Sequence, residues 1–206
     1  MTAAAIIIDM WHNYVTQEES SMHDCVENIK KFCTKEKDIK HILLATYSKN
    51  KNVSIPKEEP YWSNAELLFN QETKFEAMRA EWQNSNFGTA QETYEKMLTD
   101  WPREDQNKCA IFSSLQLLYY CNFIDPDISK LYFFGQAWDI CIKFRPVGWV
   151  NANSFNFHNL FHKKINIQTN INCVLDDNEK FINSIENFWK PVNHDGTYIL
   201  TENVWE

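Results

Sequence analysis

The sequence predicts an α/β fold of three layers, in which helices cover both faces of a Rossmann-like, mostly parallel sheet. Residues 3–8 form a continuous apolar run rich in β-branched side chains, which is typical of a strand buried on both faces. Residues 41–47 form a second run of this kind, and apolar residues at helical spacing predict a helix over 22–34 between the two. A strand, a helix and a strand in this order make a βαβ unit with parallel strands.

The rest of the chain continues this alternation, in a single domain that spans residues 1–206. A charged, helical pattern predicts a helical insertion around residues 60–100, outside the main sheet. Further strands are predicted at residues 109–112, 130–134, 165–168, 171–175 and 197–200, the last of them at an edge of the sheet. Further helices are predicted at residues 113–123, beyond Cys141 with an interruption at Pro146 and Gly148, and at residues 179–189.

Composition and charge exclude several classes of protein. The net charge of −8 and the pI near 5.3 argue against nucleic acid as a partner, because a nucleic-acid binder needs a basic face for the phosphates. The sequence has no apolar stretch of about 18 residues and no signal-peptide pattern at its N-terminus, so we expect no membrane partner. The six cysteines are scattered without a CxxC pair, which indicates reduced thiols and a cytoplasmic location.

Two residues suited to chemistry lie at the predicted strand and helix ends. Asp9 follows the first strand at its carboxyl end, where open α/β sheets bind their ligands. The strand at 130–134 runs into Gly135 and a tight turn, so Cys141 falls near the start of the next helix, which Asp139 is expected to cap. The positive end of the helix dipole is expected to lower the pKa of Cys141, and Asp9 is placed to take the thiol proton.

Two local motifs resemble a known family. The segment DMWHNY at residues 9–14 is similar to D-M-Q-N-D-F, and GQAWDICI at residues 135–142 is similar to G-x-A-x-D-x-C-V; both patterns are those of the isochorismatase-like cysteine hydrolases, which include nicotinamidases. The resemblance implies that Asp9 is the general base and Cys141 the nucleophile. It also implies an oxyanion hole in the turn at Gln136 and Ala137, with an unusual cis peptide between them, and a homo-oligomeric assembly.

The chain departs from this family at three places. No lysine follows the third predicted strand, where the family has its third catalytic residue; Lys108 is the nearest candidate, and it precedes that strand. The D-x-H metal motif is absent from residues 46–52, so the sequence supports no metal and no cofactor. Arg145 and Pro146 replace a Thr-Ala pair after the nucleophile, and an arginine there is suited to recognise a carboxylate or a phosphate.

These observations leave three hypotheses for function. The leading one is a metal-independent cysteine hydrolase that cleaves a C–N, amide-type bond of a small molecule through a covalent acyl-enzyme intermediate, in a pocket formed by Trp11, Trp138 and Arg145. The alternative is a catalytically inactive relative that serves as a binding or structural module, because the expected lysine is missing. The third keeps the fold but binds a different anionic ligand beside Arg145.

Overall fold

The computed structural model describes most of the chain outside one long central stretch. The described residues are 1–10, 19–45, 97–98, 100–111, 114–136, 138–145, 147–176 and 188–201. The strands are β1 (Thr2–Ile8), β2 (Ile39–Ala45), β3 (Asn107–Ile111), β4 (Ile128–Gln136), β5 (Asn166–Asn170), β6 (Val174–Leu175), β7 (Trp189–Pro191) and β8 (Thr197–Leu200). The helices are α1 (Glu19–Lys35), α5 (Ser114–Tyr119) and α6 (Trp149–Phe157), with π-helical turns η2 (Tyr120–Ile124) and η3 (Trp138–Ile142) and a 3-10 turn η4 (Ile171–Cys173). The insertion predicted around residues 60–100 lies almost entirely outside the described residues.

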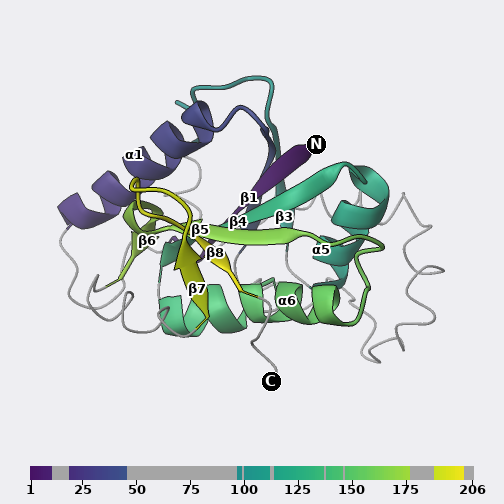
Figure 1. Ribbon diagram of the computed structural model, residues 1–206. Coiled ribbons are helices and arrows are strands. Elements are labelled where there is room, and N and C mark those ends of the chain that lie inside the picture. Colours follow the sequence, from purple (N-terminus) through teal and green to yellow (C-terminus); the bar gives the residue numbers. More distant parts are fainter. Residues whose placement is uncertain are drawn as a thin grey trace, which may run out of the picture.

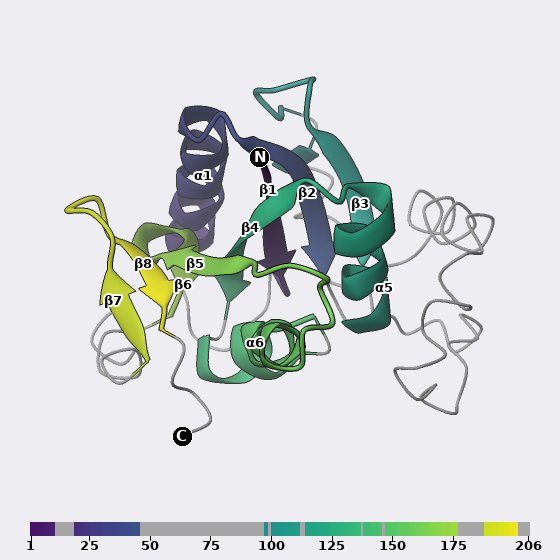
Figure 2. The same ribbon diagram turned by 45° about the vertical axis from the view of Figure 1, so that its right-hand side comes forward.

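The strands form one eight-stranded sheet in the order β3-β2-β1-β4-β5-β8-β7, and β6 pairs with the carboxyl end of β4. The pairs among β1 to β6 are parallel, whereas β8 runs antiparallel to both β5 and β7. In Figure 2 the arrowheads of β1, β2 and β4 point toward the same edge of the sheet. The predicted α/β class with a mostly parallel sheet is therefore confirmed.

Near the C-terminus the structure corrects three predictions. Of the strand predicted at residues 171–175, only Val174–Leu175 forms a strand, β6, because Ile171–Cys173 forms the 3-10 turn η4. β8 matches the strand predicted at residues 197–200, but it is not an edge strand, because β7 pairs with its outer side. Trp189, predicted as the end of a helix over 179–189, is the first residue of β7, and residues 177–187 lie outside the described part of the chain. The indole of Trp189 is buried against two other tryptophans. The apolar position that suggested a helix therefore packs into the core from a strand.

Alternate residues of β1 pack on opposite faces of the sheet, and both sets are fully buried. Ala5 and Ile7 share a core cluster with the apolar residues of α1, whereas Ile6 and Ile8 share a second cluster with α5, η3 and α6. Figure 1 shows α1 and α6 on opposite sides of the central strands. This double burial explains why residues 3–8 are apolar without alternation. The complete three-layer arrangement stays a prediction, because much of the expected helical region is not described.

A polar network closes the amino end of the sheet. His41 Nε2 lies 2.6 Å from Asp125 Oδ2, which also accepts a hydrogen bond of 2.7 Å from the Thr2 hydroxyl. The Tyr120 hydroxyl lies 2.8 Å from His41 Nδ1. Burial opposes the charge of Asp125, but the hydrogen bonds from Thr2 and His41 outweigh it and lower the pKa of this carboxyl. This network joins the starts of β1 and β2 to η2, at the end of the sheet opposite Asp9.

At the carboxyl end, β1 and β4 approach each other so closely that only glycine fits between them. Gly135 pairs with Ile8 and has a φ of +121°, a conformation that other residues rarely adopt. A Cβ atom at this position would lie 2.0 Å from the carbonyl oxygen of Ile8. β4 therefore continues past the predicted end of the strand, and its last residue lies directly beside the end of β1.

We expect Gly135→Ala to lower the free energy of unfolding by about 3 kcal/mol or more, because the new Cβ adds a backbone clash to an unfavourable φ. Gly196→Ala is the control: Gly196 also has a positive φ, of +82°, but its Cβ would meet the side chain of Ile171 at 2.7 Å rather than backbone. For this control we expect a smaller loss, of about 1 kcal/mol. Urea unfolding followed by circular dichroism measures both, and equal midpoints for the two variants would contradict the expectation.

Candidate functional site

The candidate site lies where the connections of the sheet change direction. β1 is flanked by β2 on one side and β4 on the other, so the chain that leaves β1 turns to one side and later returns on the opposite side. In open α/β sheets this switch point, at the carboxyl ends of the two strands, is where ligands bind. Asp9 follows β1, Gln136 ends β4, and η3 begins two residues later with Trp138. Asp9, Gln136 and the start of η3 therefore meet at the switch point.

Asp9 is held in an unusual and fully enclosed conformation. Its side chain is 1 % exposed, and its φ of 49° lies in the left-handed region, which costs a residue other than glycine about 1–3 kcal/mol. The backbone N–H of Asp9 donates to the carbonyl of Ala45 over 2.9 Å, which ties the end of β1 to the end of β2. Backbone strain of this kind is concentrated at functional sites.

The cation that pairs with Asp9 is Arg145. Its Nε donates to Asp9 Oδ2 over 2.5 Å, and the guanidinium side chain is 27 % exposed whereas the carboxylate is 1 % exposed. The backbone N–H of Arg145 donates to the carbonyl of Cys141 over 3.0 Å, so Arg145 lies one helical turn beyond the cysteine and on the same side of the helix. Its pKa is raised further, because the favourable Asp9 charge outweighs the cost of burial, so Arg145 stays a cation.

Cys141 lies close enough to this ion pair for the charges of both Asp9 and Arg145 to act on its thiol. The residue is 5 % exposed, and burial together with Asp9 raises the pKa of its thiol to about 12, against the opposing charge of Arg145. The prediction that the helix start lowers this pKa is therefore wrong. Loss of hydration and a neighbouring carboxylate outweigh the opposing charge of Arg145, so the resting thiol is protonated.

Asp176, which sequence reasoning missed, accepts the first N–H of the turn that carries the cysteine. Its Oδ2 lies 2.9 Å from the backbone N of Trp138. This carboxylate occupies the positive end of η3 and so offsets the field that would favour a thiolate. The side chain of Asp139, the predicted cap, lies outside the described side chains. Since Asp176 follows β6, 38 residues along the chain, no local pattern could have indicated it.

The aromatic residues beside the cysteine form core rather than an open pocket wall. Trp138 is 1 % exposed and packs against Trp149 and Trp189, with ring centroids 6.2 and 5.2 Å away. Its predicted role in lining the substrate pocket is therefore not supported by its burial. Trp11 and Ala137 lie outside the described residues, and so does the peptide bond after Gln136 that was expected to be cis.

Lys108 does not reach the site. It is the second residue of β3 and pairs with Ile42 in the first half of β2, whereas Asp9 lies beyond the carboxyl ends of these strands. Its ammonium group donates to the carbonyl of Arg103 over 3.3 Å. Lys108 lies three residues before the last residue of β3, whereas Asp9 lies one residue beyond the end of β1, so Lys108 does not take the place expected for a third catalytic residue.

Gln136 and Asp9 both carry buried polar atoms that have no hydrogen-bond partner among the described residues. These atoms are Oε1 and Nε2 of Gln136 and Oδ1 of Asp9. A buried donor or acceptor without a partner costs about 1–3 kcal/mol. The switch point therefore combines a buried ion pair, a neutral thiol and unfilled hydrogen-bonding capacity.

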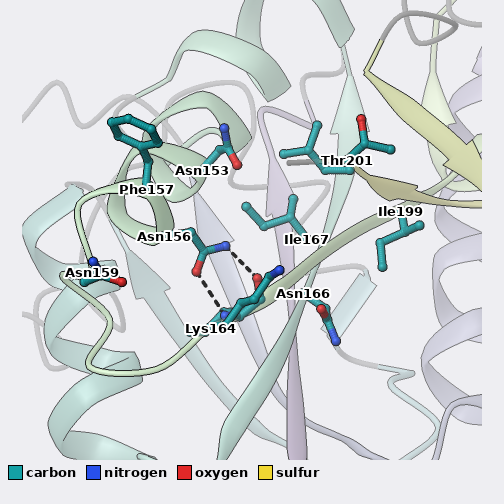
Figure 3. A pocket seen from close by; sticks show the side chains of 11 residues that line it. Asn153, Asn156, Phe157, Asn159, Lys164, Asn166, Ile167, Ile199 and Thr201 are labelled. Atoms are coloured by element: carbon teal, nitrogen blue, oxygen red, sulfur yellow. Dashed lines mark hydrogen bonds between the residues drawn. The ribbon is translucent and has the colours of Figure 1, made fainter. Parts of the chain in front are cut away.

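A separate open cavity of about 450 Å³ lies between α6 and the start of β5, away from Asp9 and Cys141. Figure 3 shows several asparagine side chains and Lys164 around it, and the dashed lines mark the two hydrogen bonds between the Asn156 amide and the backbone of Ile165. No cysteine, histidine or carboxylate lines this cavity, so it lacks the groups found at the switch point.

The described residues contain no group of three or more His, Cys, Asp or Glu side chains able to hold a metal ion. None of the helices in the same part of the chain is long and apolar enough to span a bilayer. No protein-family model, no curated protein and no solved structure matches the chain significantly. The functional argument therefore rests on the two sequence motifs and on the geometry that joins them.

We expect Asp9→Asn to speed the alkylation of Cys141 and Arg145→Gln to slow it. The carboxylate raises the thiol pKa and the guanidinium lowers it, so removal of each charge shifts the thiolate fraction in the opposite direction. A change of one pKa unit alters that fraction about tenfold. Iodoacetamide labelling across the alkaline range, read by peptide mass spectrometry, measures the rate. The buried thiol of Cys25, whose pKa burial also raises to about 12, is the internal reference. Equal rates in wild type and both variants would show that neither charge acts on the thiol.

We also expect Arg145→Met to lower the free energy of unfolding by about 3–5 kcal/mol, because it leaves the Asp9 charge buried without a partner. Adding Asp9→Asn should restore most of this loss, since asparagine carries no charge. Lys108→Met is the control for removal of a cation, with an expected loss of about 1 kcal/mol. Chemical unfolding of the wild type, the double variant and the three single variants, Asp9→Asn included, tests this; additive losses in the double variant would mean that the ion pair contributes nothing specific.

Proposed function

We propose that the protein is a cysteine hydrolase of the isochorismatase-like type, which cleaves the C–N bond of a small amide. The observation that carries the proposal is the convergence of Asp9, Cys141 and Arg145 at the topological switch point of the sheet. A base, a nucleophile and a fixed positive charge at one place are the parts that covalent acyl transfer needs.

The first half of the reaction forms an acyl-enzyme. Asp9 takes the proton from the Cys141 thiol as the sulfur attacks the carbonyl carbon, which gives a tetrahedral intermediate with a negative oxygen. The C–N bond then breaks, and the protonated Asp9 delivers its proton to the leaving nitrogen. The products are an amine or ammonia and a thioester on Cys141. Because the thiol is neutral at rest, proton transfer must accompany the attack.

The second half releases the acid. A water molecule attacks the thioester carbon while Asp9 accepts one of its protons, and the C–S bond breaks as the thiol is protonated again. The backbone N–H groups of the turn before Cys141 are suited to stabilise the oxyanion in both halves. The N–H of Trp138 is already bonded to Asp176, so other N–H groups of this turn have to serve.

Arg145 supplies the positive charge that a lysine provides in the family. It holds the Asp9 carboxylate by a short hydrogen bond and offsets the negative charge of Asp9 where a thiolate develops. A guanidinium does not exchange its proton near neutral pH, so Arg145 acts by position and charge alone. Proton transfer is therefore left to Asp9.

A second candidate function is the binding of an anionic small molecule by an inactive relative. The specific observation in its favour is the thiol pKa of about 12, together with the partial exposure of Arg145. In this role the guanidinium would receive a carboxylate or phosphate, and Cys141 would be a packing residue.

The setting that we infer for either function is a cytoplasmic homo-oligomer that acts on a small molecule, without nucleic-acid or membrane partners. The net charge of −8 and the five described cysteines, all free thiols, support a reducing compartment and an acidic surface. Size-exclusion chromatography with light scattering tests the assembly.

The experiment is an amide screen with two readouts, release of ammonia and acylation of Cys141 by peptide mass spectrometry. We expect Cys141→Ala to abolish turnover and Asp9→Asn to lower it about 10²–10⁴-fold, as loss of a general base does. Lys108→Ala and Cys25→Ala are matched controls that should retain the wild-type rate, since both residues lie away from the switch point.

If no amide acylates Cys141, the hydrolase proposal fails. Binding of small carboxylates that raises the melting temperature of the wild type, but not of Arg145→Gln, would then support the second candidate. Equal activity of Cys141→Ala and wild type would exclude the covalent mechanism even if amides were cleaved.

A further inference from the structure

Two neighbouring strand ends hold three buried polar atoms that no described residue satisfies. Asp9 and Gln136 are each 1 % exposed, and the unpartnered atoms are Asp9 Oδ1 and both Oε1 and Nε2 of the Gln136 amide. An amide that is buried with neither its donor nor its acceptor paired is rare in proteins. Its presence here requires an explanation.

The register of the sheet places these two residues next to each other. Ile8 pairs with Gly135, so Asp9 and Gln136 are the following residues of two adjacent parallel strands. Strands in a sheet lie about 4.8 Å apart, and the Gly135–Ile8 contact leaves no room for a side chain between them. Gln136 therefore lies at the same strand ends as the base, and one residue of turn separates it from η3, which carries Cys141.

Two other buried amides, those of Gln106 and Asn170, are paired, which shows that the fold can satisfy such groups. Gln106 is 3 % exposed, accepts from the indole of Trp101 and donates to the carbonyls of Cys33 and Ile39. Asn170 donates to the carbonyl of Asp195 and the hydroxyl of Thr197. Gln136 differs from these residues by its place at the switch point, where a ligand would enter.

Resting on the function proposed above, we propose that Gln136 is a specificity-determining residue that binds a cis-amide edge of the substrate. A primary amide side chain presents one N–H donor and one C=O acceptor side by side. Its complement has an acceptor and a donor on one edge with the same spacing. An open-chain secondary amide cannot provide this, because its trans geometry directs the N–H and C=O to opposite sides. The complementary ligands are primary carboxamides and ring lactams.

This assignment explains why an apolar residue is not used at the end of β4. The neighbouring positions Phe133 and Phe134 are fully buried and apolar, and a leucine or methionine would carry no unsatisfied atoms. Ligand binding supplies the missing donor and acceptor, so the amide is unfavourable in the empty site and favourable in the occupied one.

The test measures binding rather than turnover, with benzamide and 2-pyridone as probes of the two ligand shapes. N,N-dimethylbenzamide and N-methyl-2-pyridone are the matched compounds that lack the N–H donor. Binding is followed by ligand-observed NMR in wild type, Gln136→Met and Gln106→Met. Methionine is close in shape to glutamine and apolar, and the Gln106→Met control removes an amide that is already paired.

We expect at least one parent probe to bind the wild type about tenfold or more tightly than it binds Gln136→Met, as loss of paired hydrogen bonds predicts. The N-methylated compounds should bind both proteins equally weakly. Gln136→Met should raise the melting temperature, because it removes unsatisfied atoms, whereas Gln106→Met should lower it and leave probe binding unchanged. The rise in melting temperature is a sign that a merely structural glutamine would not give. If methionine at position 136 prevents folding, the same comparison is made with Gln136→Glu, which keeps the shape and replaces the donor by an acceptor.

Unchanged affinity in Gln136→Met, equal binding of parent and N-methylated probes, or no binding of either parent probe to the wild type would each overturn the inference. The outcome is separable from that of the hydrolase proposal. Probe binding that depends on Gln136 without any acylation of Cys141 would remove the hydrolase and keep the amide recognition. Acylation of Cys141 by amides that is unaffected by Gln136→Met would do the reverse.

Discussion

The contact between the ends of β1 and β4 is the constraint on which the candidate site depends. Gly135 lies against the carbonyl of Ile8, in a conformation and a space that exclude a Cβ. This contact sets how close Asp9 is to Gln136 and where the turn toward Cys141 begins. Because β4 lies on one side of β1 and β2 on the other, the same contact forms one side of the switch point. Close backbone packing, rather than any side-chain interaction, therefore brings the two motifs together.

Charge inside the site is controlled by burial and by one cation. The cost of enclosing Asp9 is offset by Arg145, which keeps a quarter of its side chain in contact with solvent. For the thiol, burial and the charge of Asp9 outweigh the opposing charge of Arg145, so the thiol stays neutral. The two ends of the sheet differ in this respect. At the amino end the partly buried carboxyl of Asp125 pairs with the buried imidazole of His41, whereas the carboxyl end leaves Asp9 Oδ1 and the Gln136 amide without partners among the described residues.

The α/β class and the position of Asp9 at a strand end could be predicted because both depend on local sequence. An apolar run without alternation predicts a strand buried on two faces, and Asp9 follows this run directly at the carboxyl end of β1. The partner of Asp9 could not be chosen from residue type alone. Lys108 matched the chemistry but lies on the wrong half of its strand, whereas Arg145 lies one helical turn from Cys141. Arg145 was predicted to recognise an anionic ligand, and its spacing from Cys141 was the signal that could have indicated its contact with Asp9.

The remaining features depend on contacts between distant segments. Asp176 reaches the start of η3 from the far side of β6, and the burial that raises the thiol pKa comes from packing of the whole sheet. Trp189 joins β7 and not a helix, since its indole completes a cluster with Trp138 and Trp149. The residue pattern in a short stretch of sequence contains none of this information. A short apolar segment fits a helix or a strand, and the contacts with distant segments decide which of the two forms.

The permanent charge of Arg145 has a consequence for the path of the proton in the proposed reaction. With a guanidinium in place of an ammonium, one carboxylate has to carry the proton in both directions. Asp9 is nearly sealed from solvent, so a proton removed from sulfur has little opportunity to exchange with bulk water before it is returned. The hydrogen that leaves on the nitrogen is then the one that began on the thiol. The buried Asp9 carboxylate thus acts first as the base and then as the acid with the same proton, so the proposed reaction needs no second acid.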